Sequence, residues 1–184
     1  MTLSSAGLNL IKSFEGCRLQ AYKDPAGIWT IGYGHTNGVK KGQVITQAQA
    51  DQFLLHDLAW AESAVNALNR DLTQGEYDAL VSFTFNCGAG NLVKLTKDRT
   101  MDQIKEKILL YNKAGGTVLT GLMRRRRAEL QMMIGEAPDV VAELRKDFQR
   151  FLNSHGAGLD VDGIIGPKSK KAWTNYKNKA GILL

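Results

Sequence analysis

Glycine and proline interrupt the segment from residue 18 to residue 45 so often that no long helix can run through it. Between the interruptions lie short runs of β-branched and aromatic residues. Glycine supplies the backbone conformations that tight turns require, and proline cannot continue a helix. The segment is therefore predicted to form a small twisted sheet, with the stretch WTIGYGHT, residues 29–36, as its clearest strand. The interrupting residues are Pro25, Gly27, Gly32, Gly34, Gly38 and Gly42.

Helical patterns flank this segment on both sides. Ser4 or Ser5 can cap a short N-terminal helix that Gly16 is placed to end, which puts Glu15 at the helix C-terminus. After the sheet, apolar residues recur every three or four positions from residue 46 to 69, as in a long amphipathic helix. Thr73 and Glu76 are predicted to form a capping box in front of a further helix at about 77–85. Other helices are predicted at about 101–112, 119–134, 140–153 and 169–177.

The chain is expected to form two pieces. A short break at residues 135–138 separates the sheet and its helices from a final stretch of about 50 residues, which is short for a domain that folds alone. We place a main domain of helices and a small sheet at 1–134, and a helical module at 135–184.

The net charge of +6 suits an anionic polymer, which could be nucleic acid, a membrane surface or a cell wall. Residues 1–10 lack the pattern of a secretory signal, and no apolar run is long enough to cross a membrane. We therefore expect synthesis in the cytoplasm without stable membrane insertion. In that compartment Cys17 and Cys87 are expected to be reduced and partly buried.

Two carboxylates and a hydroxyl form the candidate catalytic group. Glu15 closes the first helix, Asp24 lies in the turn of YKDPAG, and Thr30 lies on the following strand. The negative end of the helix dipole and burial beside Phe14 favour the protonated form of Glu15, whereas Asp24 in a wetter turn should stay ionised. Such a pair can cleave a glycosidic bond with one group as acid and the other as base or nucleophile.

The segment SFEGCRLQAYKDPAGIWTIGYGHT resembles the signature E-x8-D-x5-T of the phage-type lysozymes, glycoside hydrolase family 24. Two later blocks, DALVSFTFNCGAGNL and AGGTVLTGLMRRRRAEL, resemble the same family, so the likeness covers about residues 3–134. It implies an α+β, lysozyme-like fold, with a small β-sheet lobe and a larger helical lobe flanking a cleft. Tyr111 and Asn112 depart from the family, where many relatives are expected to carry a tryptophan.

The resemblance also implies the chemistry. Glu15 would be the proton donor, while Asp24 and Thr30 would position and activate water at C1 of muramic acid. The reaction would be hydrolysis of the β-1,4 bond between N-acetylmuramic acid and N-acetylglucosamine in bacterial peptidoglycan, with inversion. A lytic transglycosylase, which needs only the acid, and a non-catalytic wall-binding or phage structural protein remain as alternatives.

Residues 135–184 resemble small peptidoglycan-binding domains, with the pattern L-Q-x-x-L-N followed by D-G-x-x-G-P-x-T and a helix. Ser169 stands where the pattern has threonine. The module is therefore expected to bind the cell wall. The matching residues are Phe148, Gln149, Leu152, Asn153, Gly156, Asp162, Gly163, Gly166, Pro167 and Ser169.

Several other residues are weighed as site candidates. Tyr33 could stack on a sugar or pack in the sheet lobe, and His35 could contact substrate or shuttle protons, or hold local structure by hydrogen bonds. Four arginines, 124–127, point in different directions on a helix, so they form no nucleic-acid stripe, and at least one should turn inward towards Glu15 or the substrate. Asp160 and Asp162 lack the order of a calcium loop, so no metal or cofactor is expected.

The expected partner is thus peptidoglycan, with no nucleic acid. The chain is expected to be a monomer that is made in the host cytoplasm of a phage infection. It would reach the periplasmic peptidoglycan after a phage holin permeabilises the inner membrane.

Overall fold

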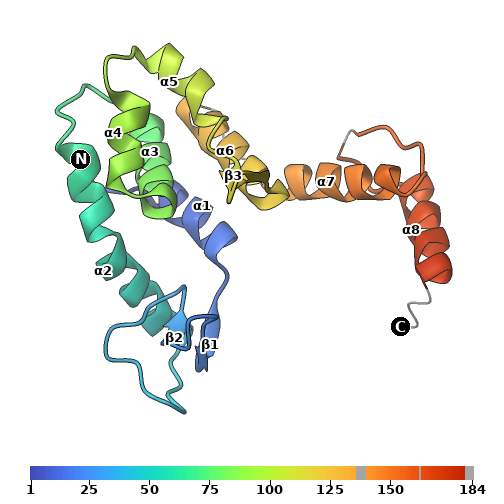
Figure 1. The fold of residues 1–184 in the computed structure, drawn as a ribbon, viewed down its shortest axis with the longest axis horizontal. Coiled ribbons are helices and arrows are strands. Elements are labelled where there is room, and N and C mark those ends of the chain that lie inside the picture. Colours follow the sequence, from blue (N-terminus) through green and yellow to red (C-terminus); the bar gives the residue numbers. More distant parts are fainter. Residues whose placement is uncertain (136–139, 162, 181–184) are drawn as a thin grey trace. The chain divides into compact units, whose positions relative to one another are not determined.

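The computed structural model describes residues 1–135, 140–161 and 163–180. Contacts divide the chain into two compact units, Met1–Pro138 and Asp139–Leu184. The first unit holds helices α1–α6 and four short strands, and the second holds helices α7 and α8 (Figure 1).

Helix α1 (Ser5–Glu15) begins and ends as the sequence predicts. Ser4 is its N-cap, and the Ser4 hydroxyl accepts a 3.1 Å hydrogen bond from the Gly7 amide. Gly16 follows with a φ of 67°, a value that glycine adopts without strain. Glu15 is therefore the last residue of the helix, next to the chain that enters the sheet.

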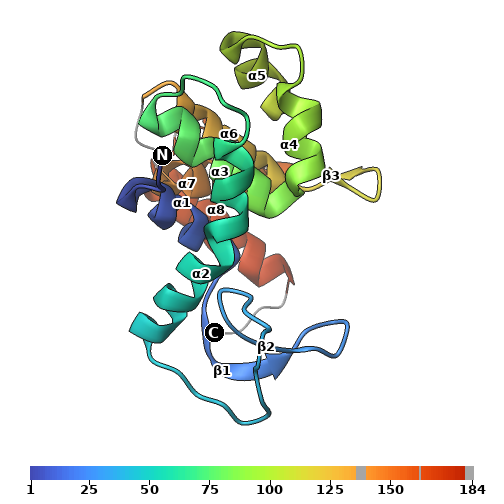
Figure 2. The ribbon, with the colours of Figure 1, turned by 90° about the vertical axis from the view of Figure 1, so that its left-hand side faces the viewer.

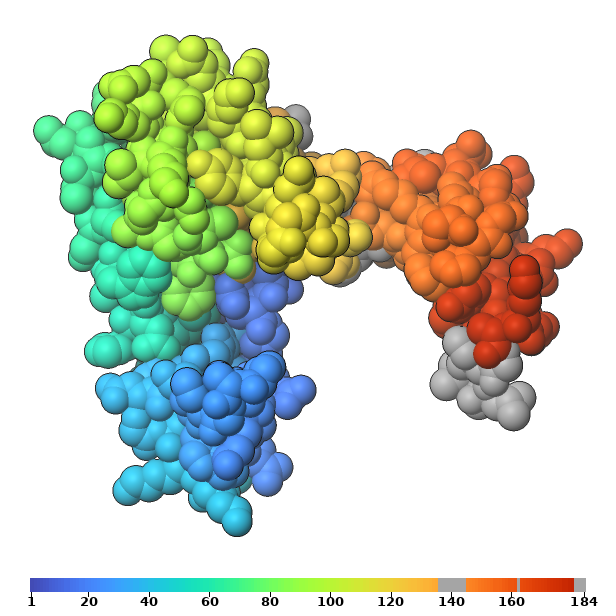
Figure 3. Space-filling view, viewed as in Figure 1, coloured from blue at the N-terminus to red at the C-terminus, as the bar shows by residue number. Residues whose placement is uncertain are grey.

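The small lobe is built on an antiparallel hairpin of β1 (Arg18–Lys23) and β2 (Trp29–Gly32). Behind it, Ile31, Ile45 and Ala50 form a small core of their own. Helix α2 (Gln47–Asn66) starts with a capping box at Thr46 and packs against both β2 and the helical lobe. The predicted long helix thus joins two lobes (Figure 2). In Figure 3 the small lobe is the blue mass of atoms below the green and yellow mass of the helical lobe.

Helix α3 (Gln74–Cys87) is the centre of the helical lobe and packs against α1, α2, α4 and α6. Its predicted capping box forms between Thr73 and Glu76, and Lys105 adds an ion pair to Glu76 at 2.9 Å. The following helices are α4 (Ala89–Thr96), α5 (Met101–Ile108) and α6 (Thr120–Met133).

The region between α3 and α6 differs from the prediction. Helix α4 was not expected, because it is only eight residues long and Gly88 gives it no side-chain cap. Helix α5 ends four residues before the predicted limit, and a second hairpin of β3 (Lys113–Ala114) and β4 (Thr117–Val118) follows. Gly115 and Gly116 both have positive φ, which a tight two-residue hairpin turn needs, so the glycine pair explains this hairpin.

In the second unit, α7 (Val140–Ser154) and α8 (Pro167–Ala180) confirm the two predicted helices, with α8 starting two residues early at a proline. The side-chain amides of two α7 residues bind the loop that connects α7 to α8. Gln149 exchanges hydrogen bonds with Gly163 and Ile164, and Asn153 exchanges two with Leu159. These amides belong to the motif singled out from the sequence; Asp162 of the same motif lies outside the described residues.

Candidate active site

Glu15 contacts an arginine from a distant part of the chain. Arg125 Nη1 of α6 donates to Glu15 Oε1 at 2.5 Å, and the Glu15 side chain is 23% exposed. The inward arginine expected from the sequence is thus identified as Arg125. Its guanidinium lies 5.7 Å from the ring of Phe14, so the surroundings of Glu15 combine an apolar ring with a cation.

Behind Glu15, a buried network holds Arg125 in place. Glu129 is completely buried, and its Oε1 accepts from the hydroxyl of Ser82 at 2.7 Å and lies 3.3 Å from Arg125 Nε. Arg125 Nη2 also donates to the Ser82 carbonyl at 3.1 Å. Contacts from Nε to Glu129 and from Nη2 to Ser82 therefore fix the planar guanidinium, which leaves Nη1 aimed at Glu15.

A second buried arginine completes the network. Arg126 forms an ion pair with Glu129 at 2.8 Å and donates to the sulfur of Cys87 at 2.8 Å. Full burial raises the pKa of the Glu129 carboxyl, and the two guanidiniums oppose that shift. Burial likewise raises the pKa of the Cys87 thiol. Glu129 thus serves two cations in the interior of the helical lobe.

The two cysteines are both free, as expected, but their burial differs. Cys87 is partly buried against Arg126, in agreement with the prediction. Cys17 is exposed, so the prediction of partial burial was wrong for this residue. It lies in the short link between α1 and β1, outside both elements.

Asp24 and Thr30 belong to one hairpin. Tyr22 pairs with Thr30 in the register of β1 and β2, and the Asp24 amide continues the ladder by donating to the Ile28 carbonyl at 3.0 Å. The side chains of Asp24 and Thr30 therefore lie diagonally on the same face. The Ile28 amide donates to Asp24 Oδ1 at 2.8 Å, and Thr30 Oγ1 donates to the Ile28 carbonyl at 3.1 Å.

Strand β1 connects this hairpin face to Glu15. Gly16 and Cys17 alone separate the end of α1 from the start of β1. Within β1 the register shifts between Arg18 and Tyr22. These two residues are four positions apart, whereas their partners in β2, Gly32 and Thr30, are two positions apart. A bulge of this kind bends a strand and redirects the side chains that follow. Glu15 and Asp24 thus lie at opposite ends of one bent strand, with Thr30 on its partner.

Tyr33 and His35 lie where the small lobe meets α2. His35 contacts Asp57 through Nδ1 at 2.8 Å and the Asn37 carbonyl through Nε2 at 3.0 Å, and its ring stacks on Phe53. The Tyr33 hydroxyl accepts from Gln47 at 2.9 Å. Burial raises the pKa of Tyr33, against the opposing charge of Lys12. Both ring nitrogens of His35 are therefore engaged within the protein, whereas Tyr33 keeps part of its ring exposed.

Sequence reasoning missed Ser82 and Glu129. Glu129 follows Arg125 and Arg126 by four and three positions, the two spacings at which helical side chains meet. That R-R-x-x-E pattern was a signal that the sequence offered. Ser82 gave no such signal, because only the packing of α3 against α6 brings it there.

Two other types of site are absent from the described residues. In that part of the chain no three histidine, cysteine, aspartate or glutamate side chains are grouped so that they could hold a metal ion. Nor does any described helix have the length and apolar character to cross a membrane.

Comparisons with known proteins agree on one family. The phage lysozyme family matches residues 12–129. The endolysin of Salmonella phage P22 is 40% identical over 138 residues, which cover 69% of this chain and 94% of the relative. The endolysin of Bacillus phage B103 is 38% identical over 84% of this chain, and the chain spans 63% of that relative's length.

Solved structures show the same likeness. The muramidase domain of SpmX from Asticaccaulis excentricus is 37% identical, covers 72% of this chain and 97% of its own, and has a TM-score of 0.66. The expected lysozyme-like α+β fold is thereby confirmed. The family match, residues 12–129, spans Glu15, Asp24, Thr30 and Arg125 as well as Ser82 and Glu129. The chain belongs to the phage lysozyme family.

Proposed function

We propose that this chain is an endolysin that hydrolyses the β-1,4 bond between N-acetylmuramic acid and N-acetylglucosamine, with Glu15 as the general acid. Membership of the phage lysozyme family supports glycoside hydrolysis of the bacterial cell wall. The observation that carries the proposal is the contact of Glu15 with Arg125, whose guanidinium is held by Glu129 and Ser82. It fixes one carboxyl group just before strand β1, which leads to Asp24.

Arg125 has a defined part in the proposed step. An acid that gives its proton to the leaving oxygen becomes a carboxylate, and a fixed cation beside it stabilises that charge without reorganisation. Arg125 is placed for this because its own side chain is only 4% exposed and cannot turn to solvent. The arginine therefore holds the Glu15 carboxyl in one orientation and favours the state that follows proton transfer.

Asp24 and Thr30 are proposed to hold the attacking water. The Ile28 amide occupies Oδ1 of Asp24, which fixes the carboxylate and leaves its second oxygen to accept from a water. The Thr30 hydroxyl uses its proton on the Ile28 carbonyl, so its oxygen can accept from the same water. Two acceptors on one face of the hairpin suit a water molecule that attacks the anomeric carbon.

This arrangement predicts inversion at the anomeric carbon. Proton NMR of the first product from a β-linked glycan should show the α anomer before mutarotation, because water attacks from the face opposite the leaving group. The β anomer would mean that Asp24 acts as a nucleophile. A 1,6-anhydro product would identify a lytic transglycosylase instead, and the absence of any product would identify a non-catalytic wall-binding protein.

Tyr33 and His35 were both considered as substrate contacts. Since His35 uses both ring nitrogens within the small lobe, we propose that it supports the loop after β2. Tyr33 is the better candidate to stack on a sugar, because its ring remains partly exposed while Gln47 and Lys12 hold it.

The proposed site is complete within one chain, so we propose a monomeric enzyme. We also propose the division into a catalytic domain, 1–134, and a wall-binding module, 135–184. The matched family segment ends at residue 129, before this boundary, which supports placing the whole reaction in the first domain.

Access to the wall is proposed to depend on a phage holin. Residues 1–10 are built into the first unit: the Met1 amine donates to Asn66 at 3.0 Å, the Leu3 amide donates to Glu62 at 2.7 Å, and Leu10 is buried. They are therefore part of the fold of the first unit. Expression in a Gram-negative host should leave the culture turbid until a holin is co-expressed, and should then cause clearing. Clearing without a holin would contradict this route.

A further inference from the structure

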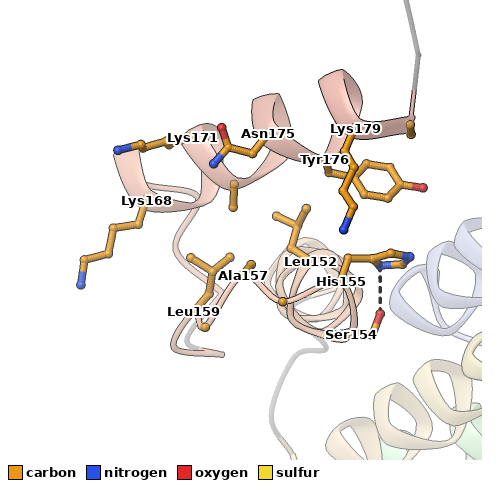
Figure 4. A pocket seen from close by; sticks show the side chains of 14 residues that line it. Leu152, Ser154, His155, Ala157, Leu159, Lys168, Lys171, Asn175, Tyr176 and Lys179 are labelled. Carbon is orange, nitrogen blue, oxygen red and sulfur yellow. Dashed lines mark hydrogen bonds between the residues drawn. The ribbon is translucent and has the colours of Figure 1, made fainter.

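The second unit contains a cavity that the proposed hydrolysis does not use. It has a volume of about 950 Å³ and lies between the C-terminal end of α7, the loop that follows, and α8 (Figure 4). Leu152, Ala157, Leu159 and Ala172 contribute an apolar lining. Cavities of about 300–1,000 Å³ are typical of small-ligand sites, so this one can hold a ligand of several residues.

The charge at the cavity has one sign. Lys168, Lys171 and Lys179 line it, and among the described residues no aspartate or glutamate does. None of these lysines forms an ion pair with a carboxylate in the described part of the chain. Figure 4 shows Lys168 and Lys171 at one end, while Lys179 lies at the other end near Tyr176 and His155. The cavity therefore suits a ligand that carries negative charge at more than one point along its length.

The cations follow one face of α8. Lys168, Lys171, Asn175 and Lys179 recur at intervals of three and four residues, so they lie along a single stripe of the helix. The eleven helical steps from Lys168 to Lys179, at about 1.5 Å each, give a stripe of about 16 Å. An extended peptide of five residues has about the same length, at roughly 3.3 Å per residue.

The opposite wall of the cavity is fixed before any ligand binds. The side chain of Asn153 donates to the Leu159 carbonyl at 2.7 Å and accepts from its amide at 2.6 Å, which closes the loop. His155 Nδ1 contacts the Phe151 carbonyl at 2.9 Å, and its ring meets the ring of Tyr176 edge-on at 4.8 Å. A site that is already formed loses little conformational entropy on binding.

We propose that this cavity binds the stem peptide of peptidoglycan. The inference rests on the proposed cell-wall substrate and names the part of it that the second unit takes. A stem peptide combines free carboxylates with the small methyl groups of alanine, which match the lysines and the small apolar lining. A polyphosphate such as teichoic acid would use the lysines but leave the apolar lining without a partner. Stem-peptide binding would hold the chain on the polymer whose glycan the first unit cleaves.

The test uses the full-length chain and a synthetic, sugar-free stem tetrapeptide, followed by calorimetry and by the NMR shifts of backbone amides. We expect saturable binding with shifts at Leu159, Asn175 and their neighbours. Lys171→Gln and Lys179→Gln should each weaken binding about tenfold, because each removes a charge-assisted hydrogen bond. Lys170→Gln is the matched control, since it removes the same charge from an exposed position of α8 outside the cavity.

Three results would overturn the proposal: no saturable binding of the tetrapeptide, an equal loss with Lys170→Gln, or tighter binding of a poly(glycerol phosphate) fragment than of the peptide. Hydrolysis of isolated glycan strands is measured on the same samples. Failure of hydrolysis with intact peptide binding counts against the proposed function alone, whereas failure of peptide binding with intact hydrolysis counts against this cavity alone.

Discussion

Replacing Glu15 with glutamine should reduce the rate of peptidoglycan hydrolysis by about 10²- to 10⁴-fold, the range typical of a lost general acid. Glutamine has almost the same shape and can still accept a hydrogen bond from Arg125, but it has no proton to give to the leaving oxygen. The decrease should appear in kcat, with KM nearly unchanged, because the proton is transferred only in the transition state. Clearing of permeabilised bacteria and product release from purified walls both measure it.

The fold should survive this substitution. Arg125 keeps its contacts with Glu129 and Ser82, and Glu15 is partly exposed, so the free energy of unfolding should change by no more than about 1 kcal/mol. Glu106→Gln is the matched control, because Glu106 is exposed on α5 and should keep full activity. Wild-type rates from the Glu15 variant would show that another group donates the proton.

The sequence predicted most of the fold because its local signals agree with the packing. Serine and threonine caps and apolar periodicity predicted where α1, α2 and α3 begin, and a glycine predicted where α1 ends. In these helices the local sequence alone specifies these boundaries. Helix α4 and the second hairpin were not predicted, because they are too short for a hydrophobic periodicity to be recognised in the sequence. Their positions depend on turns at Gly88, Gly115 and Gly116, whose conformations the structure reveals.

Only part of the candidate site could be predicted from the sequence. Glu15, Asp24 and Thr30 lie within sixteen residues, so a motif can contain them, and the geometry then shows the bulge that bends the strand between them. Arg125 comes from 110 positions further along the chain and was one of four equal choices. Burial sets Arg125 and Arg126 apart, at 3% and 0% exposed, because α6 turns those two positions towards α3. Of these two, Arg125 is the one that contacts Glu15, whereas Arg126 donates to Cys87.

The same burial makes Glu129 the residue whose loss should most reduce stability. Glu129→Ala removes the carboxylate that faces both Arg125 and Arg126 and leaves two buried guanidiniums beside a cavity. Breaking a buried ion pair by removing one partner costs about 3–5 kcal/mol. For a unit of this size that corresponds to a decrease in Tm of about 10 °C, which calorimetry of the full-length chain can measure.

Glu129→Gln separates stability from positioning. The amide keeps the volume and can still accept from Ser82 or Arg126, so this variant should be less destabilised than the alanine variant, but it no longer balances the charge of Arg125. At a temperature where the variant is fully folded, kcat should fall because Arg125 is no longer held against Glu15, while the affinity for walls stays the same. Glu106→Gln again controls for the loss of one negative charge. Unchanged stability in Glu129→Ala would mean that the guanidiniums find other partners, and unchanged kcat in folded Glu129→Gln would mean that Ser82 and the packing of α3 suffice to aim Arg125 at Glu15.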